Sequence, residues 1–342
     1  MKKFLTFAFF VLAVLLVLTS CNKQPEKLYV YNWANYIPQE VVQSFEKEYN
    51  CDVVYDFYSS NEEMYAKLKA GGTGYDIIFP SADYAQIMIN ENMLEKLDKA
   101  KVPNLSNIEQ SSLMKMSYDI NQQYCLPYMI GSTGLAVNTK YVKEYDHSWT
   151  IFERSDLKGK MSLLDDMRET LGAALKFLGY SVNTVKEAEL EQAKQLVLKW
   201  KENILKFDGL SNAKNYANSE YYVIHGYGDS IFLELDEEML KNTDYFIPKE
   251  GGTLWIDNMV MLKNSKHKEL AYKFMNYIYE PKIYAQISDY VQLPSINIPA
   301  REFITVQPMY KEGELDNCEL IMDLGKDIEL YNKVWQEIRM QN

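Results

Sequence analysis

Strand-like and helix-like segments alternate along this chain from residue 28 onward, and this alternation limits its possible folds more than any other feature. Short runs rich in Tyr, Val and Ile are typical of strands, and each is followed by a stretch with apolar residues at helical spacing. Such alternation predicts parallel sheets with helices on both faces, the arrangement of an α/β fold. The first expected elements are strands at 29–32, 52–58 and 75–80 and helices at 38–49 and 61–68, the second helix capped by Asn61.

Two glycine-marked segments predict that the chain passes twice between two lobes. The sequence LPYMIGSTGLAVNTKYV indicates two strands broken at Gly131, and GGTLWIDNMVML marks a second crossing. Between them, residues 149–246 carry their own alternation, with a long helix expected at 187–204. Helices at 268–279 and 282–290 then return to the first lobe, and the tail at 320–340 is expected to be helical. Two lobes joined in this way enclose a cleft, where small ligands bind.

The N-terminus has the layout of a secretory signal peptide. Lys2 and Lys3 precede an apolar run from Phe4 to Leu18, too short and too early for the span of a multi-pass membrane protein. The following Thr19-Ser20-Cys21 resembles the bacterial lipobox, which implies cleavage before Cys21 and acylation of its sulfur. The alternative is an ordinary signal peptide with a chance cysteine. The expected organisation is a signal peptide at 1–20, a tether at 21–27, lobe 1 at 28–134 and 254–303, and lobe 2 at 135–253 and 304–342.

Charge and reactive residues narrow the function classes. Lys and Arg total 36 against 48 Asp and Glu, a formal net charge of −12, which argues against nucleic-acid binding and favours cationic partners. Cys51, Cys125 and Cys318 lack metal-type spacing, and we interpret them as buried thiols. The three histidines are scattered, and neither a nucleophile motif nor a phosphate-binding motif occurs. We therefore expect no catalysis, no metal and no cofactor.

An aromatic residue beside a carboxylate recurs at expected strand ends and crossings. Aromatic faces attract cations and pack against methylenes, whereas carboxylates bind ammonium groups through charge-assisted hydrogen bonds. Together they predict a slot for an aliphatic chain that carries several ammonium groups. The residues concerned are Trp33 and Tyr36, Tyr227 with Asp229, Trp255 with Asp257, and the pair Asp166 and Glu169 on the first turn of a helix.

Each of these residues also has a structural alternative. Asp166 and Glu169 suit a helix N-terminus through the macrodipole alone. Trp255 alternates with Ile256, so one of the two belongs to the core, and Asp257 is placed to cap a turn. With 27 Tyr in 342 residues, Tyr227 by itself is weak evidence. The prediction rests on the joint pattern.

At these residues the sequence resembles the spermidine/putrescine-binding proteins of bacterial ABC importers. The resemblance runs from Leu28 to about Gln336 through YNWANYIP, SSNEEMYAKL, YDIIFPS, LPYMIGSTGLAVN, LLDDMRE, WIDNMV and ELYNKVWQEI. It implies a type II periplasmic-binding-protein fold of two α/β lobes that close over the ligand, with delivery to a separate permease and ATPase. By the same resemblance, Asn35 and Ser81 join the ligand site, Asp166 and Glu169 meet one amine end, and Trp255 with Asp257 clamps the chain.

The sequence departs from the family pattern at four places. Asp83 stands where an aromatic is expected, with Tyr84 next to it, and HGYGD moves the aromatic to Tyr227 while keeping Asp229. Leu293 replaces a ligand-facing Tyr, and a hydrophobic residue near Ile321 replaces a Gln of some relatives. More acid with less aromatic surface favours the ligand with more ammonium groups, so we expect spermidine to be preferred over putrescine.

The leading prediction is a lipid-anchored, monomeric receptor outside the cytoplasm that binds polyamine and works by lobe closure. One alternative is a receptor for another cationic or zwitterionic amine, such as a quaternary ammonium solute, for which fewer acids would suffice. Another is a sensor or adhesin on the same fold. An enzyme that uses Asp166 and Glu169 as an acid pair lacks any partner group for the chemistry.

Overall fold

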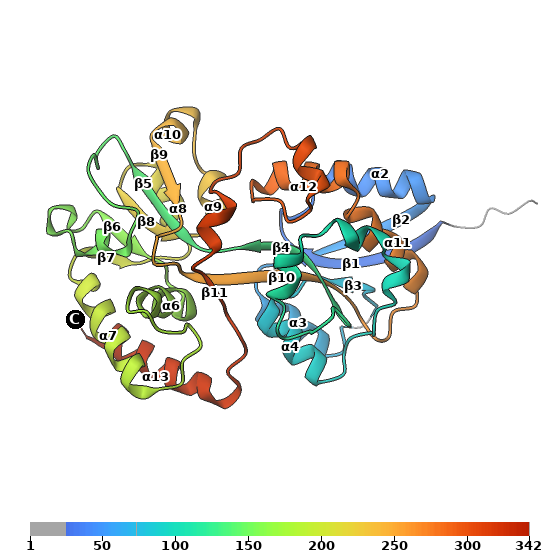
Figure 1. The fold of residues 1–342 in the computed structure, drawn as a ribbon, viewed down its shortest axis with the longest axis horizontal. Helices are drawn as coiled ribbons and strands as arrows, with labels where there is room; N and C mark the ends of the chain where they lie inside the picture. Colours follow the sequence, from blue (N-terminus) through green and yellow to red (C-terminus); the bar gives the residue numbers. More distant parts are fainter. Residues whose placement is uncertain (1–24, 73, 342) are drawn as a thin grey trace, which may run out of the picture.

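The computed structural model describes residues 25–72 and 74–341, which form two α/β lobes, each built around one sheet (Figure 1). The prediction of two lobes is confirmed. The expected signal peptide at 1–20 and the lipidation site at Cys21 lie outside the described residues. Within the described ranges, no helix combines the length and the apolar character needed to span a bilayer.

Lobe 1 contains the first strands and helices together with the segment that returns after the second lobe. Its apolar strand residues, such as Val30 and Ile78, are fully buried between the helices of the two faces. Its elements are β1 (Glu26–Trp33), α2 (Gln39–Tyr49), β2 (Cys51–Tyr58), α3 (Asn61–Lys69), β3 (Ile77–Ile78), α4 (Ala82–Asn90), α5 (Gln110–Met114), β4 (Cys125–Gly131), β10 (Thr253–Met261), α11 (Lys268–Ile278), α12 (Pro281–Val291) and β11 (Glu319–Leu320).

Lobe 2 follows β4 and has a separate core around Trp149, Leu171 and Trp200, all fully buried. The C-terminal helix α13 packs against α6 and α7, so the chain ends in this lobe. Its elements are β5 (Gly134–Asn138), β6 (Met161–Leu163), α6 (Met167–Phe177), α7 (Glu187–Lys201), β7 (Ile204–Phe207), α8 (Asn212–Ala217), β8 (Val223–Gly226), α9 (Gly228–Phe232), α10 (Glu237–Lys241), β9 (Thr243–Phe246) and α13 (Ile328–Met340).

The expectation of parallel sheets was wrong in part, because both sheets are mixed. The lobe 1 sheet runs in the order β11-β10-β3-β1-β2 with β4 also paired to β10, and the lobe 2 sheet runs β7-β6-β8-β5-β9. β10 is antiparallel to β3 and β4, and β5 is antiparallel to β8 and β9. These strands adjoin the crossings, so they enter or leave their sheets in the direction opposite to the strands of the βα units.

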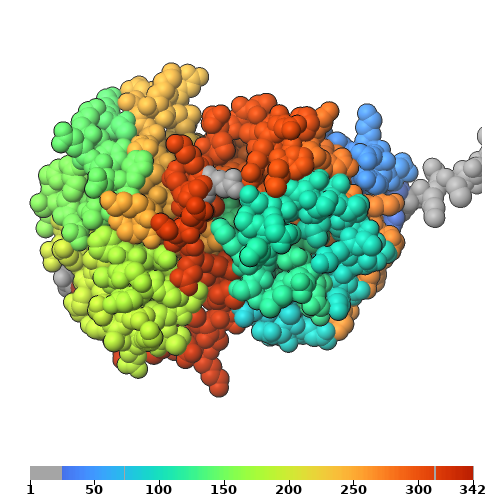
Figure 2. All heavy atoms as spheres, viewed as in Figure 1, coloured from blue at the N-terminus to red at the C-terminus, as the bar shows by residue number. Residues whose placement is uncertain are grey.

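The chain passes between the lobes at three places. Residues 132–133 join β4 to β5, residues 247–252 join β9 to β10, and the segment after α12 runs back toward lobe 2 through β11 (Figure 1). In Figure 2 this last segment, coloured red, lies across the face in view between the two lobes. On this basis we propose that the first two boundaries lie within one or two residues of those expected, and that the last lies after β11 rather than at 303, because Glu319–Leu320 pairs with β10 in the lobe 1 sheet. β5 begins at Gly134, β10 begins at Thr253, and β1 already includes the last two tether residues.

Several expected element limits were wrong where side-chain capping or a turn intervenes. The cap of α3 is Ser60, whose hydroxyl accepts a hydrogen bond from the Glu63 amide, and Asn61 is the first helical residue. Helix α7 ends at Lys201, since Ile204 starts β7. The tail is helical only from Ile328, because Glu319–Leu320 pairs with β10. Cys51 and Cys125 are buried free thiols as expected, whereas Cys318 is only partly buried.

Candidate functional site

A cavity of about 580 Å³ lies between the lobes and is lined by residues of both. Every one of the expected ligand residues except Asn35 lines it. The lining also contains residues that the sequence analysis did not single out, among them one further acid, Glu62, and one base, Arg168. The lining residues are Trp33, Ala34, Tyr36, Tyr58, Ser59, Ser60, Asn61, Glu62, Ser81, Ala82, Asp83, Tyr84, Asp166, Arg168, Glu169, Tyr227, Asp229, Ser230, Trp255, Asp257 and Ile321.

Aromatic side chains from the ends of two neighbouring strands form one wall of the cavity. Trp33 ends β1 and Tyr58 ends β2, and their ring centroids lie 4.7 Å apart. The Trp33 indole N–H and the Tyr58 hydroxyl both donate to the backbone oxygen of Phe79, at 2.9 Å and 2.6 Å. The polar edges of both rings are therefore fixed on the protein, which leaves ring faces available to a ligand. Tyr58 was not singled out from the sequence. It is an aromatic at the end of a strand, as Trp33 is, so the same sequence pattern would have indicated it.

Asp257 is held by two hydroxyl groups of lobe 1. The Tyr36 hydroxyl donates to one carboxylate oxygen at 2.7 Å, and the Ser81 hydroxyl donates to the other at 2.6 Å. Only 6 % of Asp257 is exposed. Burial raises its pKa to about 7, although both hydroxyl donors act in the opposite direction. The carboxylate is therefore oriented but carries no compensating positive charge.

Trp255 lines the cavity, while its neighbour Ile256 occupies the core position. Ile256 is fully buried and Trp255 is partly exposed in the cavity lining. Trp255 pairs across the sheet with Gly131, where an added Cβ would lie 2.2 Å from the indole Cζ2. Any larger residue at position 131 would clash with the indole, so Gly131 is required for the Trp255 ring to lie across the end of β4.

Asp166 and Glu169 occupy the N-terminus of α6, next to the cavity. Asp166 is the N-cap, and one of its oxygens accepts the amide hydrogens of Arg168 and Glu169 at 2.9 Å and 3.0 Å. Both acids nevertheless line the cavity. Burial raises the pKa of Glu169 to about 7, and the neighbouring Asp166 charge adds to this effect. Burial also raises the pKa of Asp166.

The displaced motif residues Tyr227, Asp229, Asp83 and Tyr84 all reach the cavity. Tyr227 and Asp229 enter from lobe 2 at the start of α9, and Asp83 and Tyr84 enter from lobe 1 on the first turn of α4. Burial raises the pKa of Asp83 to about 6 and also raises the pKa of Asp229. The lining thus contains acids on both sides of the cleft.

Glu62 and Arg168 were missed, although both belong to motifs quoted for the resemblance. The guanidinium of Arg168 donates to the backbone oxygens of Met322 and Val182 and to the side chain of Asn183, at 3.1, 3.3 and 2.8 Å. It also lies 4.9 Å from the ring centre of Tyr331. These hydrogen bonds are therefore made to the loop after α6 and to the C-terminal segment, and none of them is made to a cleft carboxylate.

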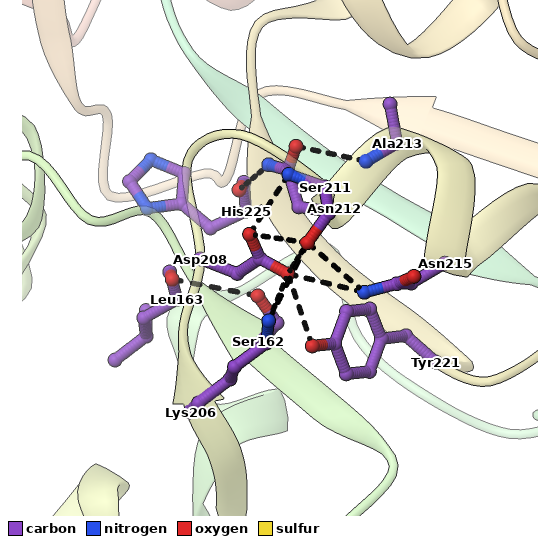
Figure 3. Close-up of polar contacts among 10 residues, drawn as sticks. All are labelled: Ser162, Leu163, Lys206, Asp208, Ser211, Asn212, Ala213, Asn215, Tyr221 and His225. Carbon is purple, nitrogen blue, oxygen red and sulfur yellow. Dashed lines mark hydrogen bonds and ion pairs between the residues drawn. The ribbon is translucent and has the colours of Figure 1, made fainter.

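A buried carboxylate elsewhere in lobe 2 shows how different the cleft acids are. Asp208 lies 3.0 Å from the Lys206 ammonium and accepts hydrogen bonds from Ser211, Asn215 and Tyr221 (Figure 3). Burial opposes its ionisation, but the Ser211 amide and Lys206 outweigh burial and lower its pKa. For five cleft acids, Asp83, Asp166, Glu169, Asp229 and Asp257, burial outweighs the favourable contacts, including the charge of Arg168 near the first three, and their pKa values are raised. The cleft is thus built for a cation that the protein itself does not supply.

Two residues named from the resemblance, Asn35 and Leu293, lie outside the cavity lining. Asn35 is exposed in a left-handed turn with a φ of 56°, and its side chain is not part of the cavity lining. Leu293 is 4 % exposed within the lobe 1 core and also does not line the cavity. Ile321, by contrast, does line it, so the hydrophobic replacement near the C-terminus faces the ligand space.

Comparison with known proteins gives a consistent picture. Residues 40–307 match the family of bacterial extracellular solute-binding proteins. The chain is 33% identical over 320 residues to the spermidine/putrescine-binding periplasmic protein of Escherichia coli, covering 91% of each chain. It is 31% identical over 334 residues to a putrescine/cadaverine-binding protein of Pseudomonas aeruginosa, covering 92% of this chain and 94% of that protein.

A solved structure with a similar fold is the TpPotD lipoprotein of Treponema pallidum. It superposes with a TM-score of 0.89 at 41% identity, covering 92% of this chain and 100% of that one. The expected fold, two α/β lobes of the periplasmic-binding type with a ligand cleft between them, is thereby confirmed.

Proposed function

The chain belongs to the family of bacterial extracellular solute-binding proteins, and from this premise we propose that it is a polyamine receptor that delivers its ligand to an ABC permease. It acts outside the cytoplasm and performs no chemistry on the ligand. The relatives named for spermidine, putrescine and cadaverine support this ligand class. Lobe closure over the bound amine is the signal that such a receptor presents to a permease.

The observation that carries the proposal is the charge of the cleft. Six carboxylates line the cavity, and the one lining cation, Arg168, donates hydrogen bonds to the loop after α6 and to the C-terminal segment. Unpaired buried carboxylates are costly, and a bound polycation removes that cost. Aromatic faces at Trp33, Tyr58 and Trp255 suit the methylenes between the ammonium groups. The six acids are Glu62, Asp83, Asp166, Glu169, Asp229 and Asp257.

Titration calorimetry tests the ligand class directly. Putrescine, cadaverine, spermidine, spermine and tetramethylammonium should be titrated in turn into protein that lacks residues 1–21. We expect saturable binding of at least one polyamine and no comparable binding of the quaternary amine. Tight binding of tetramethylammonium with none of any polyamine would replace the proposal with the aromatic-cage alternative, for which a single cation suffices.

We further propose that the mature protein is a monomer anchored to the membrane through acyl chains on Cys21. The layout of residues 2–21 supports the anchor, and a structurally similar relative is named a lipoprotein. The first described strand begins at Glu26, so only a few residues would separate the anchor from lobe 1. Such a short tether holds the receptor close to the membrane that carries its permease.

A further inference from the structure

Glu169 accepts hydrogen bonds from threonines at the first two chain crossings. The Thr133 hydroxyl, between β4 and β5, donates to Glu169 Oε2 at 2.6 Å. The Thr253 hydroxyl, at the start of β10, donates to the same oxygen. Glu169 itself stands on α6 of lobe 2, and only 3 % of it is exposed. A carboxylate of lobe 2 thus accepts hydrogen bonds from two of the segments that connect the lobes.

A histidine behind Thr133 fixes the direction of these hydrogen bonds. His225 is fully buried, its Nε2 lies 2.8 Å from Thr133 Oγ1, and its ring points away from the Asp208 network (Figure 3). Burial lowers the pKa of His225 to about 3, so the ring is neutral. A threonine hydroxyl has one hydrogen, and when Glu169 receives it, Nε2 must be the nitrogen that carries the ring proton. His225 therefore donates to Thr133, and Thr133 donates to Glu169.

Close packing keeps Thr253 in place against α6. An added Cβ at Gly172, one turn after Glu169, would lie 2.4 Å from Thr253 Cγ2. The missing side chain at Gly172 allows the helix to approach β10 closely enough for the hydroxyl to reach Glu169. The contact between α6 and the second crossing is thus built into the packing.

We propose that Thr133 and Thr253 are positioning residues of the ligand site, which hold Glu169 ionised and oriented so that its other oxygen, Oε1, accepts a ligand ammonium group. Two donors on one carboxylate oxygen favour the charged form. The proposal rests on the polyamine function, because the ammonium group is the expected partner of Oε1. It also means that ligand charge at this end of the cleft acts directly on the crossings. Neither threonine lines the cavity.

The groups around Glu169 permit a clean pH test. The neighbouring tyrosines have pKa values raised by burial and His225 stays neutral, so neither changes charge between pH 5.5 and 9, whereas the pKa of Glu169 is about 7. Arg168 stays charged over the same range. The charged and titratable groups that face Glu169 are Asp166 and Arg168 on the N-terminal turn of α6, His225 on β8, Tyr227 before α9 and Tyr245 on β9.

The variants are Thr133→Val and Thr253→Val, tested in the full chain solubilised in mild detergent. Valine keeps the branched shape, including the methyl next to Gly172, and removes the donor. Loss of one donor to a charged group should raise the pKa of Glu169 by about one unit. Because only ionised Glu169 binds the ammonium, putrescine and spermidine affinity should fall about fivefold at pH 7 and return to near the wild-type value at pH 9.

Two controls separate this effect from general damage. Thr253→Ser keeps the hydroxyl and should keep the wild-type pH profile. Thr170 is equally buried, but its hydroxyl donates to the Leu164 backbone oxygen at 2.7 Å, so Thr170→Val should lower affinity equally at all pH values or not at all. In a Glu169→Gln background, the two valine variants should have no further effect on the pH profile.

A readout without ligand makes the result independent of the proposed function. Thermal unfolding of the ligand-free valine variants should show a larger loss of Tm at pH 8.5, where Glu169 is ionised, than at pH 5.5, where it is protonated. Equal losses at the two pH values, together with a pH-independent change in affinity, would overturn the positioning role. The wild-type protein could bind no polyamine while the valine variants still lose more Tm at pH 8.5 than at pH 5.5. In that case the two threonines do stabilise ionised Glu169, and the proposed polyamine function is wrong.

Discussion

Replacing Asp257 by Asn should weaken ligand binding and at the same time leave the ligand-free protein as stable as wild type or more stable at pH 8. Asn has nearly the same shape and no charge. The lost charge contact with an ammonium group is expected to cost about 2–5 kcal/mol, or roughly 30-fold to a few thousandfold in Kd. A misfolded variant would lose both affinity and stability. A loss of affinity without a loss of stability therefore identifies Asp257 as a ligand contact.

The stability side follows from burial. The pKa of Asp257 is raised from 3.8 to about 7, so keeping it ionised in the folded protein at pH 8 costs on the order of 4 kcal/mol. The amide removes that cost, but it presents a donor to either the Tyr36 or the Ser81 hydroxyl, and one poor hydrogen bond costs about 1–3 kcal/mol. The net expectation at pH 8 is a Tm at or above that of wild type. At pH 5 Asp257 is already protonated in the folded protein, so the cost that the amide removes falls to about 1–2 kcal/mol, and the poorer hydrogen bond should cancel it.

The assay is calorimetric titration at pH 8 together with thermal unfolding of the ligand-free protein at pH 5 and pH 8. The matched control is Asp76→Asn, also in lobe 1 and 1 % exposed. Asp76 is bonded to the Tyr29 amide, the Ser265 hydroxyl and His267, away from the cleft. That variant should lose stability at both pH values and keep its affinity. Polyamine binding by Asp257→Asn within threefold of wild type, or a clear loss of Tm at pH 8, would refute the assignment.

Four further outcomes are expected. Trp255→Ala should weaken polyamine binding at least tenfold through loss of cation–π and methylene contact, while circular dichroism shows an intact fold; unchanged titrations would remove Trp255 from the site. Because the pKa values of Glu169 and Asp257 are raised to about 7, the folded protein binds more protons than the unfolded chain between about pH 4 and 7. The ligand-free Tm should therefore fall as pH rises through that window, and saturating polyamine should reduce the fall; a Tm that rises instead would contradict the shifts. Cys21→Ala should abolish labelling by a fatty-acid probe and leave the protein unprocessed or soluble, so unchanged labelling would exclude the lipid anchor. Competition calorimetry at two ionic strengths should favour spermidine over putrescine, with a preference that narrows at high salt, and tighter putrescine binding at both would overturn the argument from acid count.

The order of the elements and most of the ligand residues could be predicted from sequence because they depend on local patterns. The spacing of the apolar residues distinguishes strands from helices, and Gly131 marks the first crossing between the lobes. An aromatic at the end of a strand, as at Trp33, is unusual enough to indicate a site, because a residue in that place is covered either by core or by ligand. The alternation around Trp255 left two choices, and only burial of Ile256 separated them.

The remaining features depend on contacts between residues far apart in the chain. Tyr36 and Asp257 are 221 positions apart, and Thr133 reaches Glu169 only because two lobes meet at the crossings. Asn35 lies in an exposed left-handed turn outside the cavity lining, so its role in the site stays a prediction. A sequence pattern fixes the period of an element and the place where it ends, since both follow from backbone geometry. Which side chains then share a cavity, and which hydroxyls compensate a buried charge, follows from packing and non-local hydrogen bonds, so only the tertiary structure decided them.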